Sequence, residues 1–320
     1  SKSTQYESIA IESLIMLGKT YEQMGEYQKA LQAYEKAMSK GSSVGRTHYA
    51  RILGDDSIPG IEHDTAKSLS ILTELCDNKD PFALSVLGSI YMNGKSGIPK
   101  DEKKGIELLH QSADLNSPEG KYEYGMCLLN GTGIEKDYKK ARKYLQESSG
   151  ENNLDSYYAL AKIYKEGLGV KKDFSTAVDY LKSAAQNGFV RAGYQAGLYY
   201  LEKGKFKNAY KSFLAASESG DIDATYQLAL LLKDGKGVHD KKPDVPRAAE
   251  ILKELADLEG NVDAMRELGL IHLRKLMKHA RLRFAAYYLE KAADKGDCIS
   301  QFNYATMLES GNGIPLDLEK

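Results

Sequence analysis

The chain has 320 residues with 44 basic and 45 acidic side chains, and its net charge of −1 gives no bulk attraction to nucleic acid or to an anionic membrane. Its three cysteines, Cys76, Cys127 and Cys298, are far apart and form no CxxC pair, which argues against a disulfide framework or a zinc site and favours a reducing compartment. No apolar run reaches the roughly 18 residues of a membrane span, and the start SKSTQYESIA lacks the apolar core of a signal peptide, so we expect a cytoplasmic protein with no transmembrane segment. Since the first residue is not Met, a location in the ER lumen is the alternative if a signal peptide has been removed.

The first predicted helix pair lies within residues 13–44 and begins SLIMLGKTYEQMGEYQKALQAYEKAMSKG. Gly18 and Ala30 are small enough to let two helices approach closely, and Tyr21 and Tyr34 would fill the space beside them. The segment resembles a tetratricopeptide repeat, with Ser42 in place of the proline that closes that pattern.

A longer pattern follows from residue 45 to the last residue, and its clearest copy is SYYALAKIYKEGLGVKKDFSTAVDYLKSAAQNG at 156–188. Each copy has a small residue in its first helix, and successive gaps are 37, 36, 36, 32, 40 and 36 positions. The small residues are Gly88, Gly125, Ala161, Gly197, Ala229, Gly269 and Ala305. Helical periodicity at a fixed repeat length predicts a stack of helix pairs.

Paired glycines separate the two helices of most copies. They are Gly94 and Gly97, Gly131 and Gly133, Gly167 and Gly169, Gly235 and Gly237, and Gly311 and Gly313. An aspartate follows the second glycine by four residues at Asp101, Asp137, Asp173 and Asp317. Because glycine readily adopts the left-handed conformation and aspartate can cap exposed N–H groups, each loop should end one helix and start the next.

The complete pattern resembles the Sel1-like repeat family, a relative of the tetratricopeptide repeat. The resemblance implies an all-α fold, a right-handed superhelical α-solenoid of about nine stacked units that forms one domain over residues 1–320. After the first unit we place the others at about 45–80, 81–117, 118–152, 153–188, 189–220, 221–260, 261–296 and 297–320. The last unit stops where its second helix should begin, so we expect it to be truncated. Unit 189–220 has a short link instead of a glycine loop, and unit 261–296 has LRKLMKHARLR there.

The sequence contains no motif that predicts catalytic, cofactor-binding or metal-binding residues. The histidines stand in different units, and none belongs to a motif that would place it beside an activated Ser or Cys. They are His48, His63, His110, His239, His272 and His279. The sequence Gly94-Lys-Ser ends like a phosphate-binding loop, but it lacks the glycine spacing of that motif and the strand before it. We therefore expect no enzyme activity and no cofactor.

Two sets of residues are candidates for binding a partner. The first set occupies two positions of each copy. One is a column of tyrosines three positions before the small residue of the first helix, and the other is the position directly after that small residue. The column contains Tyr122, Tyr158, Tyr194 and Tyr226, and its neighbours are Met126, Lys162, Leu198 and Leu230. In tetratricopeptide-type repeats this column tends toward the concave wall, and tyrosine suits an interface because it offers a large area with few rotatable bonds. The alternative is that these tyrosines pack between neighbouring units.

The second set is basic. Arg274, Lys278 and Arg281 are spaced i, i+4, i+7 and would share one face of a predicted helix. They could bind an acidic peptide, a phosphate-bearing partner or an anionic membrane surface. The alternative is a solvated helix face.

We therefore expect a non-catalytic scaffold or adaptor whose concave face holds a peptide or a helix of a partner protein, without nucleic acid. The settings known for the Sel1-like family include ER-associated degradation complexes, activation of chitin synthase and bacterial proteins that act on a host. Association with a peripheral membrane complex through a partner protein is a further alternative. The alternative function is a regulatory repeat arm of a larger multidomain enzyme, for example a kinase, or of an ER-associated degradation complex.

Overall fold

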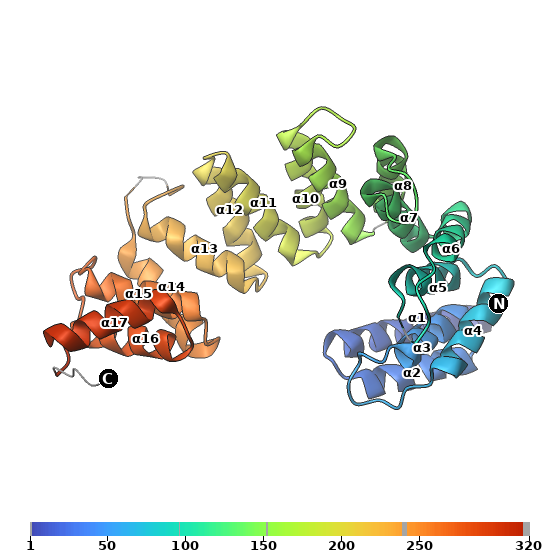
Figure 1. Ribbon diagram of the computed structural model, residues 1–320, viewed down its shortest axis with the longest axis horizontal. Coiled ribbons are helices and arrows are strands. Elements are labelled where there is room, and N and C mark those ends of the chain that lie inside the picture. Colours follow the sequence, from blue (N-terminus) through green and yellow to red (C-terminus); the bar gives the residue numbers. More distant parts are fainter. Residues whose placement is uncertain (1, 96, 152, 239–241, 316–320) are drawn as a thin grey trace. The chain divides into compact units, whose positions relative to one another are not determined.

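The computed structural model describes residues 2–95, 97–151, 153–238 and 242–315. These residues form seventeen α-helices and no strand, which confirms the all-α prediction (Figure 1). The chain divides into two compact units, residues 1–177 and 178–320, and the division falls within α10 (Phe174–Gln186). A single domain over the whole chain stays a prediction.

The first unit contains the helices that precede the division. They are α1 (Lys2–Gln23), α2 (Tyr27–Ser39), α3 (Ser43–Gly54), α4 (Thr65–Asp77), α5 (Pro81–Asn93), α6 (Glu102–Asp114), α7 (Pro118–Asn130), α8 (Tyr138–Gly150) and α9 (Leu154–Glu166). Each helix from α1 to α8 packs against the next one along the chain, α5 also touches α3 and α7, and α7 touches α9. The odd-numbered helices are the first helices of their pairs, so their direct contacts create what we call the first-helix layer. Because α1 starts at Lys2, residues 2–12 extend the first tetratricopeptide-like helix.

The second unit follows the same order. Its helices after α10 are α11 (Val190–Glu202), α12 (Phe206–Glu218), α13 (Ile222–Lys233), α14 (Val245–Leu258), α15 (Val262–Leu273), α16 (Leu282–Asp294) and α17 (Cys298–Ser310). Neighbours along the chain again pack together, and α11 touches α13 directly. The first-helix layer therefore recurs in this unit.

Small residues allow the two helices of a pair to approach closely, as the sequence predicts. A Cβ atom built on Gly18 would lie 2.4 Å from the ring of Tyr34, and one built on Gly197 would lie 2.4 Å from the ring of Phe213. Both rings are fully buried. Real Cβ atoms do not come this close, so glycine is required for this packing distance.

The glycine loops also follow the prediction. Helices α5, α7, α9 and α17 each end at the first glycine of a pair, which is left-handed with φ between 62° and 75°. Asp101 accepts a hydrogen bond from the N–H of Lys104 at 3.0 Å, and Asp137 accepts one from Lys140 at 2.9 Å. Asp173 caps α10 in the same way, whereas Asp317 lies outside the described residues.

The second glycine of most pairs has a further role that the sequence did not reveal, Gly97 being the exception. A Cβ on Gly169 would lie 2.5 Å from Cβ of Tyr138, and a Cβ on Gly237 would lie 2.4 Å from the carbonyl oxygen of Phe206. Tyr138 and Phe206 are the first residues of α8 and α12, the second helices of the preceding copies. The loop glycine therefore lets one repeat rest directly on the next.

Candidate partner-binding surfaces

The structure places the predicted tyrosine column on first helices. Tyr122 and Tyr158 lie on the touching helices α7 and α9 of the first unit, and Tyr194 and Tyr226 lie on α11 and α13 of the second. Tyr158 is 38% exposed, whereas the other three are half-buried.

Two of the half-buried tyrosines are held by the next repeat. Tyr226 packs against the core cluster formed by α13 to α16, and burial together with Glu267 and Asp263 raises its pKa to about 12. Burial and the carboxylate of Asp155 likewise raise the pKa of Tyr122 to about 12. The environments of Tyr226 and Tyr122 favour the interpretation that these two tyrosines pack between neighbouring copies.

Tyr194 has a different environment. The ring centroid of Phe213 lies 5.9 Å from its own, and the guanidinium carbon of Arg191 lies 4.5 Å from its ring centroid. Arg191 in turn forms an ion pair with Asp223 of α13 at 2.5 Å. The ring therefore packs within its own helix pair and is half-buried, while Arg191 makes the contact with the neighbouring first helix α13. One position after the small residue, Lys162 is exposed, and the remaining three side chains are half-buried, namely Met126, Leu198 and Leu230.

The unit at 81–117 has serines at the two positions where most other copies have the tyrosine column and its neighbours. A groove of 280 Å³ lies beside these serines. Ser85 stands three positions before Gly88, and Ser89 stands one position after it. We call this the serine groove; its lining comes from α3, α5 and α7 and from the residues that follow α3 and α5. The lining residues are Arg51, Asp55, Phe82, Ser85, Val86, Ser89, Ile90, Asn93, Lys95, Glu119 and Glu123. Sequence reasoning missed it because it searched these columns for large side chains, although the two serines were visible there.

The charges of the serine groove are unevenly compensated. Arg51 forms an ion pair with Glu22, and the carboxylate of Asp55 accepts hydrogen bonds from Ser57. Glu123 forms no ion pair within the described ranges, and burial together with the charge of Asp155 raises its pKa. The α7 side of the groove therefore favours a cationic group from a ligand.

The prediction of a basic helix from Arg274 to Arg281 is wrong. Helix α15 ends at Leu273 and α16 begins at Leu282, so Arg274, Lys278 and Arg281 belong to a loop and share no helix face. Lys275 is left-handed with φ of 53°, the position that glycine takes in the other loops. The three basic side chains are exposed, and binding by them is untested.

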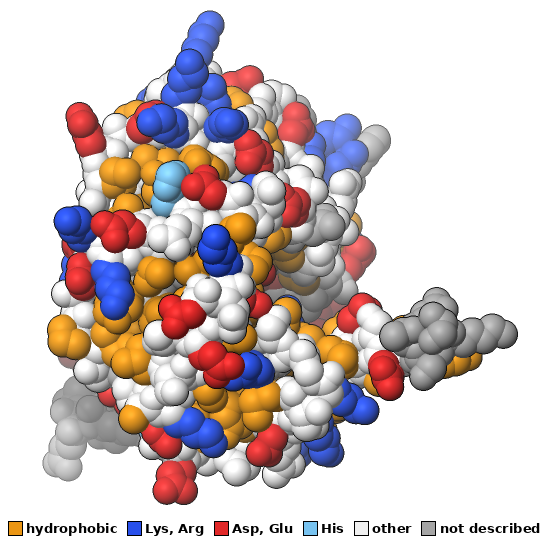
Figure 2. Space-filling model, turned by 90° about the vertical axis from the view of Figure 1, so that its right-hand side faces the viewer, with side chains coloured by type: hydrophobic (Ala, Val, Ile, Leu, Met, Phe, Trp, Pro, Cys, Tyr) orange, Lys and Arg blue, Asp and Glu red, His pale blue; other side chains and the backbone are white. Residues whose placement is uncertain are grey.

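The face in Figure 2 mixes acidic and basic side chains without a large area of one sign. Among the described residues, no group of three or more His, Cys, Asp or Glu side chains is arranged to hold a metal ion. Within the same residues, no helix is long and apolar enough to span a membrane. His239 lies outside them.

Stacked helix pairs joined by glycine loops define this chain as an α-solenoid repeat protein. The Sel1 repeat model matches residues 81–117, 118–153, 154–189, 222–259, 262–297 and 298–320, and a tetratricopeptide repeat model matches residues 11–39. Because these Sel1 segments cover more than half of its length, the chain belongs to the Sel1 repeat family. The matched segments omit all of unit 45–80, which lacks the GxG loop, and all but the first residue of unit 189–220, which has the short link.

Two solved structures are similar over much of the chain. A protective antigen present in uropathogenic Escherichia coli strains is 23% identical with a TM-score of 0.62, and the match covers 96% of this chain and 66% of that one. A Sel1 repeat protein from Oxalobacter formigenes is 26% identical with a TM-score of 0.56, and the match covers 72% of this chain and 94% of that one. This chain thus spans about two thirds of the length of the antigen. Comparison with curated proteins gives no match.

Proposed function

We propose that this chain is a non-catalytic scaffold that binds a peptide or a helix of a partner protein on its first-helix layer. Sel1 repeats are typical of interaction scaffolds, and the fold is consistent with that role. The observation that carries the proposal is the serine groove, because it opens in the columns where most other repeats have tyrosine or a long side chain.

The groove can accept one anchoring side chain and the backbone next to it. Phe82 and Ile90 supply apolar lining, and Glu119 and Glu123 stand on the α7 side. A lysine or arginine of the partner beside Glu123 would offset its repulsion from Asp155, which favours binding of a cationic segment. Exposed Tyr158 and Lys162 on the adjacent α9 would extend the contact along the layer.

The test compares variants that change this layer with a matched variant elsewhere. Ser89→Leu should fill the groove, and Tyr158→Ala should remove an exposed ring. Tyr287→Ala is the control, since Tyr287 is 46% exposed on the second helix α16. Quantitative affinity purification followed by calorimetry on each recovered partner should show a loss of about 2 kcal/mol in binding free energy for the first two variants and little change for the control.

Circular dichroism and thermal melts of the same samples separate binding from folding. Partners that remain bound to folded Ser89→Leu and Tyr158→Ala with unchanged affinity would remove the first-helix layer as the site. Equal loss of affinity in Tyr287→Ala would show that the effect is not specific to that layer.

A further inference from the structure

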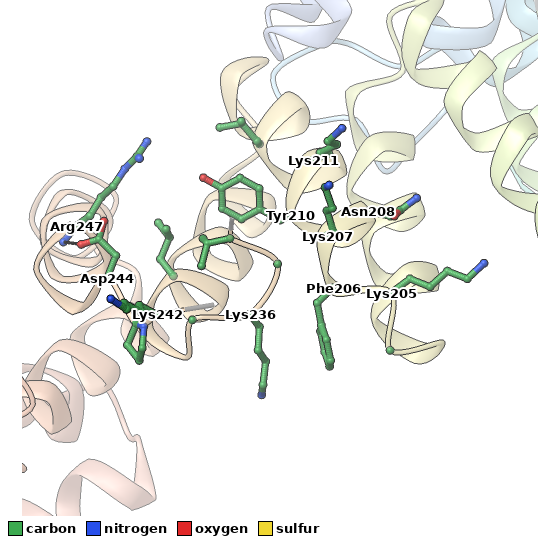
Figure 3. A pocket seen from close by; sticks show the side chains of 17 residues that line it. Lys205, Phe206, Lys207, Asn208, Tyr210, Lys211, Lys236, Lys242, Asp244 and Arg247 are labelled. Atoms are coloured by element: carbon green, nitrogen blue, oxygen red, sulfur yellow. Dashed lines mark hydrogen bonds between the residues drawn. The ribbon is translucent and has the colours of Figure 1, made fainter. Parts of the chain in front are cut away.

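The second unit contains a groove of 1330 Å³ between α12 and the start of α14. Lys207 and Tyr210 enter it from α12, and Asp244 and Arg247 face them from the beginning of α14 (Figure 3). We call this the basic groove. Its walls come mainly from second helices, so it is separate from the first-helix layer.

Cationic side chains dominate the lining. Six of the lining residues are basic, and they are Lys205, Lys207, Lys211, Lys236, Lys242 and Arg247. Lys207, Lys211, Lys242 and Arg247 form no ion pair with any residue that the structure describes. Several uncompensated cations around one hollow produce a positive potential that an anionic ligand would neutralise.

The carboxylates near this groove are already engaged. Asp244, the acidic residue of the described lining, accepts a hydrogen bond from the backbone N–H of Arg247 at 3.2 Å and so caps α14. Asp234 pairs with Lys236 at 2.8 Å, and the same Lys236 ammonium lies 5.7 Å from the ring centroid of Phe206. One acidic residue stands against six basic ones in the described lining, so the groove keeps an excess of positive charge.

Apolar side chains lie between the cations. Phe206 is 37% exposed, Tyr210 and Leu214 are half-buried, and Leu232 is buried. The groove is larger than the roughly 300–1,000 Å³ of pockets that enclose a small molecule. Its size and mixed lining fit a segment of several residues that combines acidic groups with an apolar anchor.

Two departures from the repeat create the groove. The link between α11 and α12 is only residues 203–205, and the link between α13 and α14 extends from 234 to 244. Gly237 holds the longer link against the carbonyl of Phe206, since any Cβ there would lie 2.4 Å from that oxygen. No side chain caps the start of α12 at Lys205, and the positive end of its dipole adds to the attraction for an anion.

We propose that the basic groove binds a short acidic segment of a partner protein. Its carboxylate or phosphate groups would lie against Lys207, Lys211 and Arg247, and an apolar side chain would cover Phe206. Nucleic acid fits less well, because α14 continues with the exposed acids Glu250 and Glu254 and the positive surface ends with the groove. A nucleic acid needs basic contacts along an extended track of phosphates.

Fluorescence anisotropy with defined probes tests the proposal on the full chain. The first probe is a labelled peptide of twelve residues, rich in Glu and with one central Phe; the second has phosphoserine in place of Glu. Lys207→Glu with Arg247→Glu should weaken binding of at least one of them by tenfold or more. Lys171→Glu with Lys172→Glu is the control, because it changes the net charge equally at two exposed residues of the loop between α9 and α10, and it should weaken binding less than twofold.

Three further probes sharpen the result: a peptide with Lys in place of Glu, one with Ala in place of Phe, and an oligouridine of twelve nucleotides. The proposal expects no binding of the Lys peptide, weaker binding of the Ala peptide, and a Kd that rises between 50 and 200 mM salt. Preference for the Glu or the phosphoserine peptide identifies the anionic group. No binding of either acidic peptide, equal weakening by both charge reversals, or tighter binding of oligouridine would each overturn it. If the reversed variant loses helicity, Lys207→Gln with Arg247→Gln repeats the comparison.

Discussion

Acidification should destabilise the first unit through one histidine. His48 on α3 is 7% exposed, and its ring stacks on Tyr34 with centroids 4.8 Å apart and planes 9° from parallel. Phe82 lies against it at 4.9 Å. Burial, followed by the charges of Arg51 and Lys19, lowers the pKa of His48 to about 3.

A nearby carboxylate does not reverse this shift. Glu22 Oε1 lies 3.8 Å from His48 Nδ1, but it accepts a hydrogen bond from the Tyr34 hydroxyl at 2.5 Å, and the other oxygen of Glu22 pairs with Arg51. The carboxylate is therefore committed to other donors, and Nδ1 has no hydrogen-bond partner within the described part of the chain. His48 stays neutral in the folded protein.

The sign and size of the effect follow from proton linkage. In the unfolded chain the ring regains an ordinary pKa of about 6.5, so the unfolded state binds more protons between that pH and about 3. The contribution of neutral His48 is fully present above the unfolded pKa and is lost as pH falls toward the folded one. Relative to pH 8, the loss at pH 4.5 is about 2.7 kcal/mol, at about 1.36 kcal/mol for each unit of pH.

Amide hydrogen exchange in α2 and α3, corrected for the intrinsic exchange rate at each pH, measures this free energy locally. A local readout is needed because repeats can open separately. His48→Phe keeps an aromatic ring between Tyr34 and Phe82, and it should lose about 2.7 kcal/mol less than the unaltered protein between pH 8 and 4.5. His279→Gln, at an exposed position, should behave like the unaltered protein. The reasoning fails if His48→Phe and the unaltered protein lose the same opening free energy.

Two further stability measurements test the packing and the charges. Gly197→Ala should lower the free energy of unfolding by about 1–3 kcal/mol, because its methyl would lie 2.4 Å from the Phe213 ring. Gly125→Ala, whose nearest contact is 3.1 Å, should change it by less than about 1 kcal/mol, and equal shifts in Tm would contradict the packing. Glu123→Gln should raise Tm at pH 8, because burial and Asp155 raise the pKa of Glu123 and so disfavour its charged form. That gain should shrink as the pH falls through the raised folded pKa toward about 4.5, since the folded state then takes up the proton first, and a gain independent of pH would refute this cause.

The helix pairs and their loops were predictable because each is specified by neighbouring residues. Gly167 at the end of α9 and Asp173 before α10 act through the backbone within a few positions, so their spacing in the sequence is also their spacing in the structure. The contact of Gly169 with Tyr138 was not predictable, since it joins residues 31 positions apart.

The prediction of a helix from Arg274 onward is wrong for a related reason, since the turn there also depends on contacts that the local sequence does not show. Leu276 donates its N–H to the carbonyl of Ile271 at 3.1 Å, as Leu168 donates to Ile163 at 3.0 Å after a glycine. Lys275 thus completes the same left-handed turn without glycine, although this conformation costs a non-glycine residue about 1–2 kcal/mol. Periodicity alone could not show that Met277 packs against the core of the second unit and helps to hold the turn.

Both candidate grooves occur where the chain departs from its own repeat, and packing explains why. A regular repeat places a similar side chain at each position, so each hollow between neighbouring helices is filled in the same way. Ser85 and Ser89 stand where most other repeats have larger side chains, and volume remains beside them. The short link at 203–205 and the longer one from 234 leave volume beside α12 by changing the backbone instead. The gaps of 32 and 40 positions were visible in the sequence, but only the structure shows that they lie beside the same lysines. Identical repeats present identical surfaces, so selectivity for a partner has to come from such departures.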